Sequence, residues 1–168
     1  LMDLATLEIP TLRSLRLDFG SEHLRISESE LRRLIPMRHN AVLTALHLDF
    51  SRSLDGRSWR TPSADITDIG PLADLRHMPN LHTLHLILAE NNLGDSGAEA
   101  LGSLKHSPNL RILTLDLTSN GIATAGVRAI CGINDVRGLH SLTLKLGGND
   151  RIGIDAIHAL ATLQRAPD

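Results

Sequence analysis

Aromatic residues are scarce in this chain of 168 residues: it contains no Tyr, two Phe and one Trp. A chain with so few rings offers few platforms on which the bases of a single-stranded nucleic acid could stack. The 17 basic residues are balanced by 19 acidic ones, so there is no positive excess to follow a phosphate backbone. We therefore expect no nucleic acid partner.

Cysteine is almost absent as well. The single Cys131 cannot form an internal disulfide, which excludes a secreted disulfide scaffold and favours an intracellular, reducing compartment such as the cytoplasm or an organelle interior. No apolar run approaches the roughly 20 residues needed to span a bilayer, so no direct membrane insertion is expected. Residues 1–10 lack the basic and apolar regions of a signal peptide.

Leucine, in contrast, occurs 32 times, and its positions repeat. The clearest unit has Leu at 81, 84, 86, 88 and 93 with Asn at 91, and most of these positions recur 29 and 58 residues later. Less complete copies begin at Leu12 and Leu43. Five units therefore cover nearly the whole chain. We expect their strands near Leu15, Leu46, Leu86, Leu115 and Leu144.

Each unit changes its hydrophobic period halfway along. Leu84, Leu86 and Leu88 alternate with other residues, which predicts a strand with one buried face. Leu101 and Leu104 then recur at helical spacing before a proline ends the segment. Strands joined through helices by repeated right-handed crossovers are parallel, so the chain is predicted to wind into a coil with strands on one side.

The pattern LxxLxLxLxxNxL followed by GxxxLxxLxxxPxL resembles the leucine-rich repeat family. Its length and its helix resemble the ribonuclease-inhibitor-like subclass, in a variant with a lengthened strand. The resemblance covers roughly residues 4–167. It implies an α/β solenoid, or horseshoe, of about five repeats, with parallel strands on the concave side and helices on the convex side. We expect residues 1–168 to form a single leucine-rich repeat domain within a longer repeat array.

Three asparagines recur where the chain leaves the strand: Asn91, Asn120 and Asn149. A buried amide at this turn can bond backbone groups of its own coil and of the adjacent one. We therefore expect a structural asparagine ladder rather than catalytic groups. Gly97 and Gly126 are expected where neighbouring helices approach closely, and no phosphate-binding glycine motif is present, so no cofactor is expected.

The nine histidines are the main candidates for chemistry. His47 and His85 should be neighbours on the concave strands, with Asp49 on the same face. Two imidazoles and a carboxylate could hold a divalent metal, but the column offers no further His or Cys, so we expect no metal. Cys131 falls on the convex side, which leaves these residues without a nucleophile, and we expect no catalytic residues and no enzymatic activity.

The remaining candidate site is the concave surface. Its columns of outward-facing strand residues give the candidate partner-binding set Arg16, Asp18, His47, Asp49, His85, Asp116 and Lys145. A rigid wall of this kind lowers the ordering cost of binding another protein. The resemblance also implies that the concave face is the usual face for partners. The alternative is that these charges serve only solubility.

Residues 51–65 interrupt the second unit and are predicted to form an insertion loop. This loop supplies a second candidate set, Arg57, Trp59 and Arg60, because Trp and Arg are enriched at interface hot spots. Alternatively, Trp59 folds back to cover Leu54 or Ile66.

The chain begins in the helical half of a unit, with Leu4, Leu7 and Pro10, and stops where another strand is due. Neither end resembles a cap, so we expect both solenoid ends to be covered by further repeats or a neighbouring subunit. The function expected is a protein–protein interaction module, or a scaffold or structural subunit of a larger assembly. Two alternatives remain: a regulator of a signalling enzyme such as a GTPase, and the recognition half of a ligand sensor.

Overall fold

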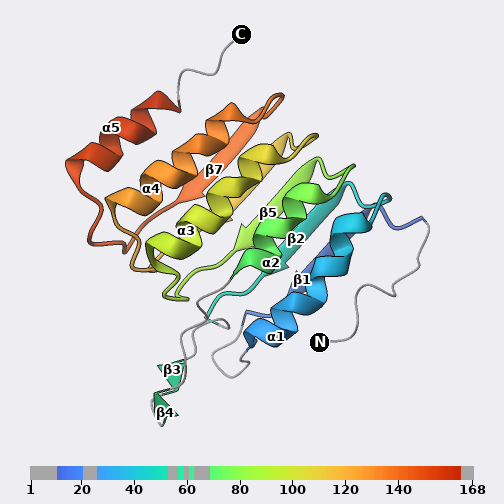
Figure 1. Cartoon of the computed structure of the whole chain (residues 1–168), viewed down its shortest axis with the longest axis horizontal. Helices are drawn as coiled ribbons and strands as arrows, with labels where there is room; N and C mark the ends of the chain where they lie inside the picture. The colour runs from blue at the N-terminus through green and yellow to red at the C-terminus, as the bar shows by residue number, and fades with distance from the viewer. Residues whose placement is uncertain (1–10, 21–25, 53–56, 59–60, 63–68, 164–168) are drawn as a thin grey trace.

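The protein is represented by a computed structural model that describes residues 11–20, 26–52, 57–58, 61–62 and 69–163. Five strands form one parallel sheet in chain order, which confirms the predicted solenoid (Figure 1). They are β1 (Ser14–Asp18), β2 (Ala45–Asp49), β5 (Thr83–Ile87), β6 (Ile112–Asp116) and β7 (Ser141–Lys145).

Neighbouring strands pair at the spacing of the repeat. Leu84 of β5 lies opposite Leu46 of β2 and Leu113 of β6, and the same register holds along each strand. Because side chains alternate between the two faces of a strand, this register places all the strand leucines on one face and the polar residues in columns on the other.

A layer of helices covers one face of the sheet (Figure 1). Its α-helices are α1 (Glu28–Leu31), α2 (Gly70–Ala73), α3 (Gly94–Gly102), α4 (Thr124–Cys131) and α5 (Ile154–Thr162). The first four continue as 3-10 helices: η2 (Arg32–His39), η3 (Asp74–His77), η4 (Ser103–His106) and η5 (Gly132–Asp135). This change of helix type was not predicted. η2 also contains Pro36, which has no N–H to donate to a helical hydrogen bond.

The hydrophobic core lies between the sheet and the helices. Leu84 and Leu86 of β5 and Leu101 of α3 are completely buried, as is Leu104 of η4. Phe19 and Phe50 follow β1 and β2 at equivalent places, and their rings stack with centroids 5.2 Å apart. Each unit thus buries its apolar residues against the next, as expected for stacked repeats.

Neighbouring helices were expected to approach each other closely at Gly97 and at Gly126, and of these two they do so at Gly126. A Cβ on Gly126 of α4 would lie 2.6 Å from Asp95 Oδ1 and 2.9 Å from Ala98 Cβ, both on α3. At Gly97 the crowding comes from its own unit, because a Cβ there would lie 2.7 Å from Leu93 Cβ. Gly126 therefore allows the close approach of α3 and α4, as does Gly102 of α3, where an added Cβ would lie 2.6 Å from Ala129 O.

Part of the insertion is ordered as a short antiparallel hairpin of β3 (Arg57–Ser58) and β4 (Thr61–Pro62). In Figure 1 this hairpin stands apart from the five-stranded sheet. Trp59, Arg60 and the side chain of Arg57 lie outside the described part of the structure, so their binding role stays a prediction. The apolar residues expected at the start of the chain, Leu4 and Leu7, also lie outside it.

Candidate functional site

All seven residues predicted for the concave surface lie on the sheet face that points away from the helices. The strand register places Arg16, His47 and His85 in one column. A second column contains Asp18, Asp49, Ile87, Asp116 and Lys145. A third column contains Ser14, Ala45, Thr83, Ile112 and Ser141. We call this surface the concave face.

Two histidines lie side by side at the middle of the concave face. The ring centroids of His47 and His85 are 5.6 Å apart, with an angle of 35° between the ring planes. His47 Nε2 is buried and has no hydrogen-bond partner within the described structure. Burial lowers the pKa of His47, and the nearby Arg16 and His85 lower it further, against the opposing effect of Asp49 and Asp18. The neutral form of this imidazole is therefore favoured.

Three carboxylates of the concave face, those of Asp18, Asp49 and Asp116, accept hydrogen bonds from the turns that follow their strands. Asp18 accepts a hydrogen bond from the backbone N–H of Gly20 at 3.0 Å. Asp49 accepts bonds from the Ser51 N–H and hydroxyl at 2.9 and 2.7 Å. The sequence predicted these residues only as partner contacts. Their side chains also hold the local backbone, which fixes their orientation on the surface.

Asp116 is the most deeply buried charge of the concave face, with 8% of the residue exposed. It accepts hydrogen bonds from the Thr118 hydroxyl at 2.7 Å and from Lys145 Nζ at 2.9 Å. Burial raises the pKa of Asp116, but the bonds from Thr118 and Lys145 outweigh this effect, and the pKa falls below its ordinary value. Asp116 and Lys145 therefore form a local charge pair.

The three recurring asparagines connect successive coils through their side chains. Asn120 Oδ1 accepts the backbone N–H groups of Asn91 and Leu93. Its amide group donates to the carbonyl oxygens of Leu88 and Thr118. Asn149 repeats this arrangement one unit later, and its amide reaches Leu117 O at 2.9 Å. These bonds satisfy buried backbone groups that the sheet does not reach.

Sequence reasoning missed two further sets of bonds between coils. Asp95 of α3 accepts the backbone N–H groups of Ala123 and Gly126 at 2.8 and 2.9 Å, at the start of α4. On the opposite edge of the solenoid, the side-chain amides of Asn80 and Asn109 donate to the carbonyl oxygens of Ala41 and Pro79. The 29-residue offset between Asn80 and Asn109 was the available signal.

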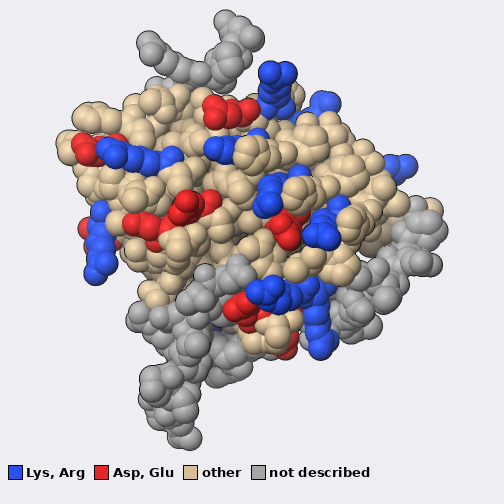
Figure 2. Space-filling view, in the orientation of Figure 1, with Lys and Arg blue, Asp and Glu red and all other residues tan. Residues whose placement is uncertain are grey.

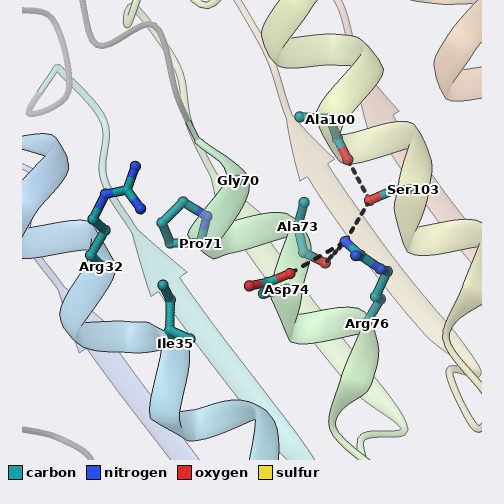
Figure 3. A pocket seen from close by; sticks show the side chains of 9 residues that line it. All are labelled: Arg32, Ile35, Gly70, Pro71, Ala73, Asp74, Arg76, Ala100 and Ser103. Atoms are coloured by element: carbon teal, nitrogen blue, oxygen red, sulfur yellow. Dashed lines mark hydrogen bonds and ion pairs between the residues drawn. The ribbon is translucent and has the colours of Figure 1, made fainter.

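A hollow of about 330 Å³ lies on the helical side, between η2, α2 and α3 (Figure 3). One of its polar side chains, Arg76, already has hydrogen-bond and ion-pair partners within the protein. The Arg76 guanidinium donates to Ala73 O and Ser103 Oγ, both at 3.2 Å, and pairs with Asp74 at 3.5 Å. The bond to Ser103 joins η3 to η4, so Arg76 has a structural role in the wall of the hollow.

Two further features of the described residues bear on the kind of site. Within the described ranges, no group of three or more His, Cys, Asp or Glu is arranged to hold a metal ion. The described helices include none long and apolar enough to cross a membrane.

Two stretches of the chain, residues 77–102 and 106–131, match the model of the leucine rich repeat. No curated protein matches the sequence. Among solved structures, the crystal structure of an internalin from Listeria monocytogenes is similar, with 18% sequence identity and a TM-score of 0.38. That similarity covers 94% of this chain and 46% of the internalin chain, so this chain spans less than half of that protein. The parallel sheet with its alternating helices has the architecture of an α/β leucine-rich repeat solenoid, and the two matched stretches are similar to the leucine rich repeat.

Proposed function

We propose that this chain is a non-enzymatic protein-interaction module whose concave face binds a partner protein. Leucine-rich repeat domains generally mediate protein–protein interactions. The observation that carries the proposal is the ordered set of charged and imidazole side chains on the concave face, including the His47–His85 pair and the Asp116–Lys145 pair. Such a surface offers both apolar contact and charge complementarity to a protein partner.

The rigidity of this surface supports the proposal. Asp49 and Asp116 are held in place by bonds from Ser51 and Thr118. The asparagine ladder fixes the coils that carry them. Side chains that are already ordered lose little conformational entropy when a partner binds.

The surroundings of the reactive groups support a non-enzymatic reading. The neighbours of His47 in its column are Arg16 on β1 and His85 on β5, so neither neighbour is a serine or a cysteine. Cys131 ends α4, in the layer on the other face of the sheet. Burial raises the pKa of the Cys131 thiol, which disfavours the reactive thiolate. We extend the proposal to a reducing intracellular compartment, where such a single thiol is maintained.

We also propose that the repeats belong to the ribonuclease-inhibitor-like subclass, in its lengthened-strand variant. The 29-residue spacing of the third to fifth units and the α-helices on the convex side support this assignment. A crystal structure in which the convex segments 94–102 and 124–131 are extended would contradict it.

We propose further that another repeat or a neighbouring subunit packs on α5. Val127 of α4 is completely buried, whereas Ile157, in the matching place of α5, is 58% exposed. Ile154 is 71% exposed. Large aliphatic side chains that cluster at a surface favour burial in an interface.

Photo-crosslinking tests the concave-face proposal. A photoreactive amino acid is placed at His85 or Ile112 on the concave face, or at Glu99 or Arg128 on the helices as a matched control. The tagged protein is then exposed to an extract of its source cells. We expect discrete crosslinked proteins from the concave positions only, and we expect excess untagged protein to remove them. Equal crosslinking from both sets, or none from the concave positions, would contradict the proposal.

A further inference from the structure

A row of basic residues runs along the edge of the solenoid at which the strands begin. Arg13, Thr44, His82, Arg111 and His140 each precede one strand of the sheet. Every member after the first donates its backbone N–H to the carbonyl oxygen of the member before it, at 2.8 Å. The side chains therefore stand on neighbouring rungs, about 4.8 Å apart. Four of the five are Arg or His.

A second row lies beside the first, where the 3-10 helices end. The last two residues of η2, η3 and η4 are Arg38–His39, Arg76–His77 and Lys105–His106. In each unit a short connection leads from these residues to the next strand, so both rows share one edge. The row is interrupted at η5, whose last residue is the exposed Asp135, and Arg137 lies in the connection after it. We call the two rows the strand-entry rim: Arg13, Arg38, His39, Arg76, His77, His82, Lys105, His106, Arg111, Arg137 and His140.

Most of the charge on this rim is not neutralised within the described structure. Arg76 pairs with Asp74 at 3.5 Å. Arg13, Lys105, Arg111 and Arg137 are exposed, and none of them forms an ion pair with a described residue. In Figure 2 several basic side chains stand along the upper right, the side on which the 3-10 helices end in Figure 1, and most acidic ones lie away from it.

The helix dipole explains only one of the two rows. Cations near a helix C-terminus are stabilising, which accounts for the residues at the ends of η2, η3 and η4. Arg13, Arg111 and His140 belong to strand entrances, where no comparable dipole exists. Arg111 has His82 and His140 on its neighbouring rungs, so no acidic residue of this row lies opposite it. The concave face, in contrast, pairs Asp116 with Lys145 on such rungs.

We propose that the strand-entry rim is a second interaction surface, which binds an acidic segment of a protein partner. Arginine side chains such as Arg13 and Arg111 bind carboxylates through two parallel hydrogen bonds. The imidazole of His140 donates a hydrogen bond to a carboxylate in either protonation state, whereas His82 already uses its Nδ1–H to donate to Asn80 O at 2.6 Å. The rim differs in charge from the mixed concave face, so the two surfaces fit different partner segments.

A protein partner is favoured over nucleic acid by the composition of the surface. The two phenylalanines, Phe19 and Phe50, stack on each other at the opposite edge, where β1 and β2 end. The rim therefore contains no Phe, Tyr or Trp within the described ranges on which a base could stack. The net charge of −2 also opposes binding to an extended phosphate backbone.

A binding assay with a defined peptide tests this inference. Fluorescence anisotropy measures the dissociation constant of a labelled peptide of about ten glutamates, at about 50 mM salt. The rim variant is Lys105→Glu with Arg111→Glu. Its matched control is Arg128→Glu with Arg151→Glu, which reverses two exposed cations on the helices and the opposite edge and changes the net charge equally. Circular dichroism checks that both variants are folded.

We expect the rim variant to bind the peptide at least about fivefold more weakly than the wild-type protein, and the control variant to stay within about twofold. Binding by the wild-type protein should weaken as salt is raised to about 300 mM. No binding by the wild-type protein, or equal losses in both variants, would overturn the proposal. Tighter, rim-dependent binding of an oligothymidylate or of anionic phospholipid vesicles would overturn the assignment to a protein partner. Photo-crosslinking from His85 and Ile112 tests the proposed function separately.

Discussion

Asn149 Oδ1 lies 3.0 Å from the backbone nitrogen of Asn120, so a side chain of the fifth unit holds the turn of the fourth. The same relationship joins Asn120 to Asn91 at 3.2 Å. Each asparagine thus connects two coils in a direction that the strand hydrogen bonds do not cover.

Replacing Asn120 by alanine should lower the free energy of unfolding by about 1–3 kcal/mol, because buried backbone groups lose their partners. Urea denaturation measures this change. The control is Asn109→Ala, since exposed Asn109 makes one bond, to Pro79 O, and should cost less than about 1 kcal/mol. Equal stability of Asn120→Ala and the wild-type protein would contradict the ladder argument.

The lowered pKa of Asp116 should make stability depend on acid pH. In the unfolded chain this carboxyl takes its ordinary pKa, near 3.8, so it binds a proton at a higher pH than the folded protein does. The stabilisation is present above the ordinary pKa and is lost as the pH falls through the folded pKa. Urea unfolding followed from neutral pH to about pH 3 should show this decline. Asp116→Asn should flatten it, and an unchanged pH profile would count against the role of Asp116.

His47 should give a second pH effect at higher pH. Its folded pKa is below the ordinary value of 6.5, so the unfolded chain binds the proton first as the pH falls. The stabilisation is therefore complete above about pH 6.5 and is lost progressively below it, until the folded protein also binds the proton. His47→Gln should remove this part of the pH dependence. NMR titration of the His47 ring would contradict the prediction if its midpoint lay at or above 6.5.

Gly126→Ala should destabilise the protein even though alanine favours helices. The added Cβ would lie 2.6 Å from Asp95 Oδ1, which itself caps α4. The gain in helix propensity is about 1 kcal/mol, whereas overpacking typically costs about 1–3 kcal/mol and the cap is also disturbed, so we expect a net loss of about 1–2 kcal/mol. Gly147→Ala is the control, because nothing lies within 4 Å of its added Cβ. Thermal melts in which both variants matched the wild-type protein would refute the close approach at Gly126.

The isolated 168-residue chain should self-associate through α5. Ile154→Lys with Ile157→Lys should shift sedimentation towards the monomer, because it replaces exposed apolar side chains by charged ones. Ile112→Lys, at a residue that is 39% exposed on the concave face, is the control and should leave the association unchanged. A stable monomer for the unsubstituted chain at all concentrations would contradict this prediction.

The strand positions and their register were predictable from the sequence because a fixed repeat leaves little freedom. Once Leu84 and Leu113 occupy equivalent places, a one-residue slip would move both from the core to solvent. The same logic correctly placed His47 beside His85. Helix type was less predictable, since α and 3-10 segments bury nearly the same residues and differ in local hydrogen bonding.

The sequence by itself determined the parallel solenoid and the residues of each concave column, because the spacing of leucines specifies both period and face. Only the tertiary structure decided how those residues are bonded: Asp49 and Asp116 close turns, and Asp95 caps a helix of the next unit. The strand-entry rim also emerged only in three dimensions. Some of its members lie at the ends of 3-10 helices and others directly before strands. Each helix runs back to the edge at which the next strand begins, so these positions meet at one edge of the solenoid.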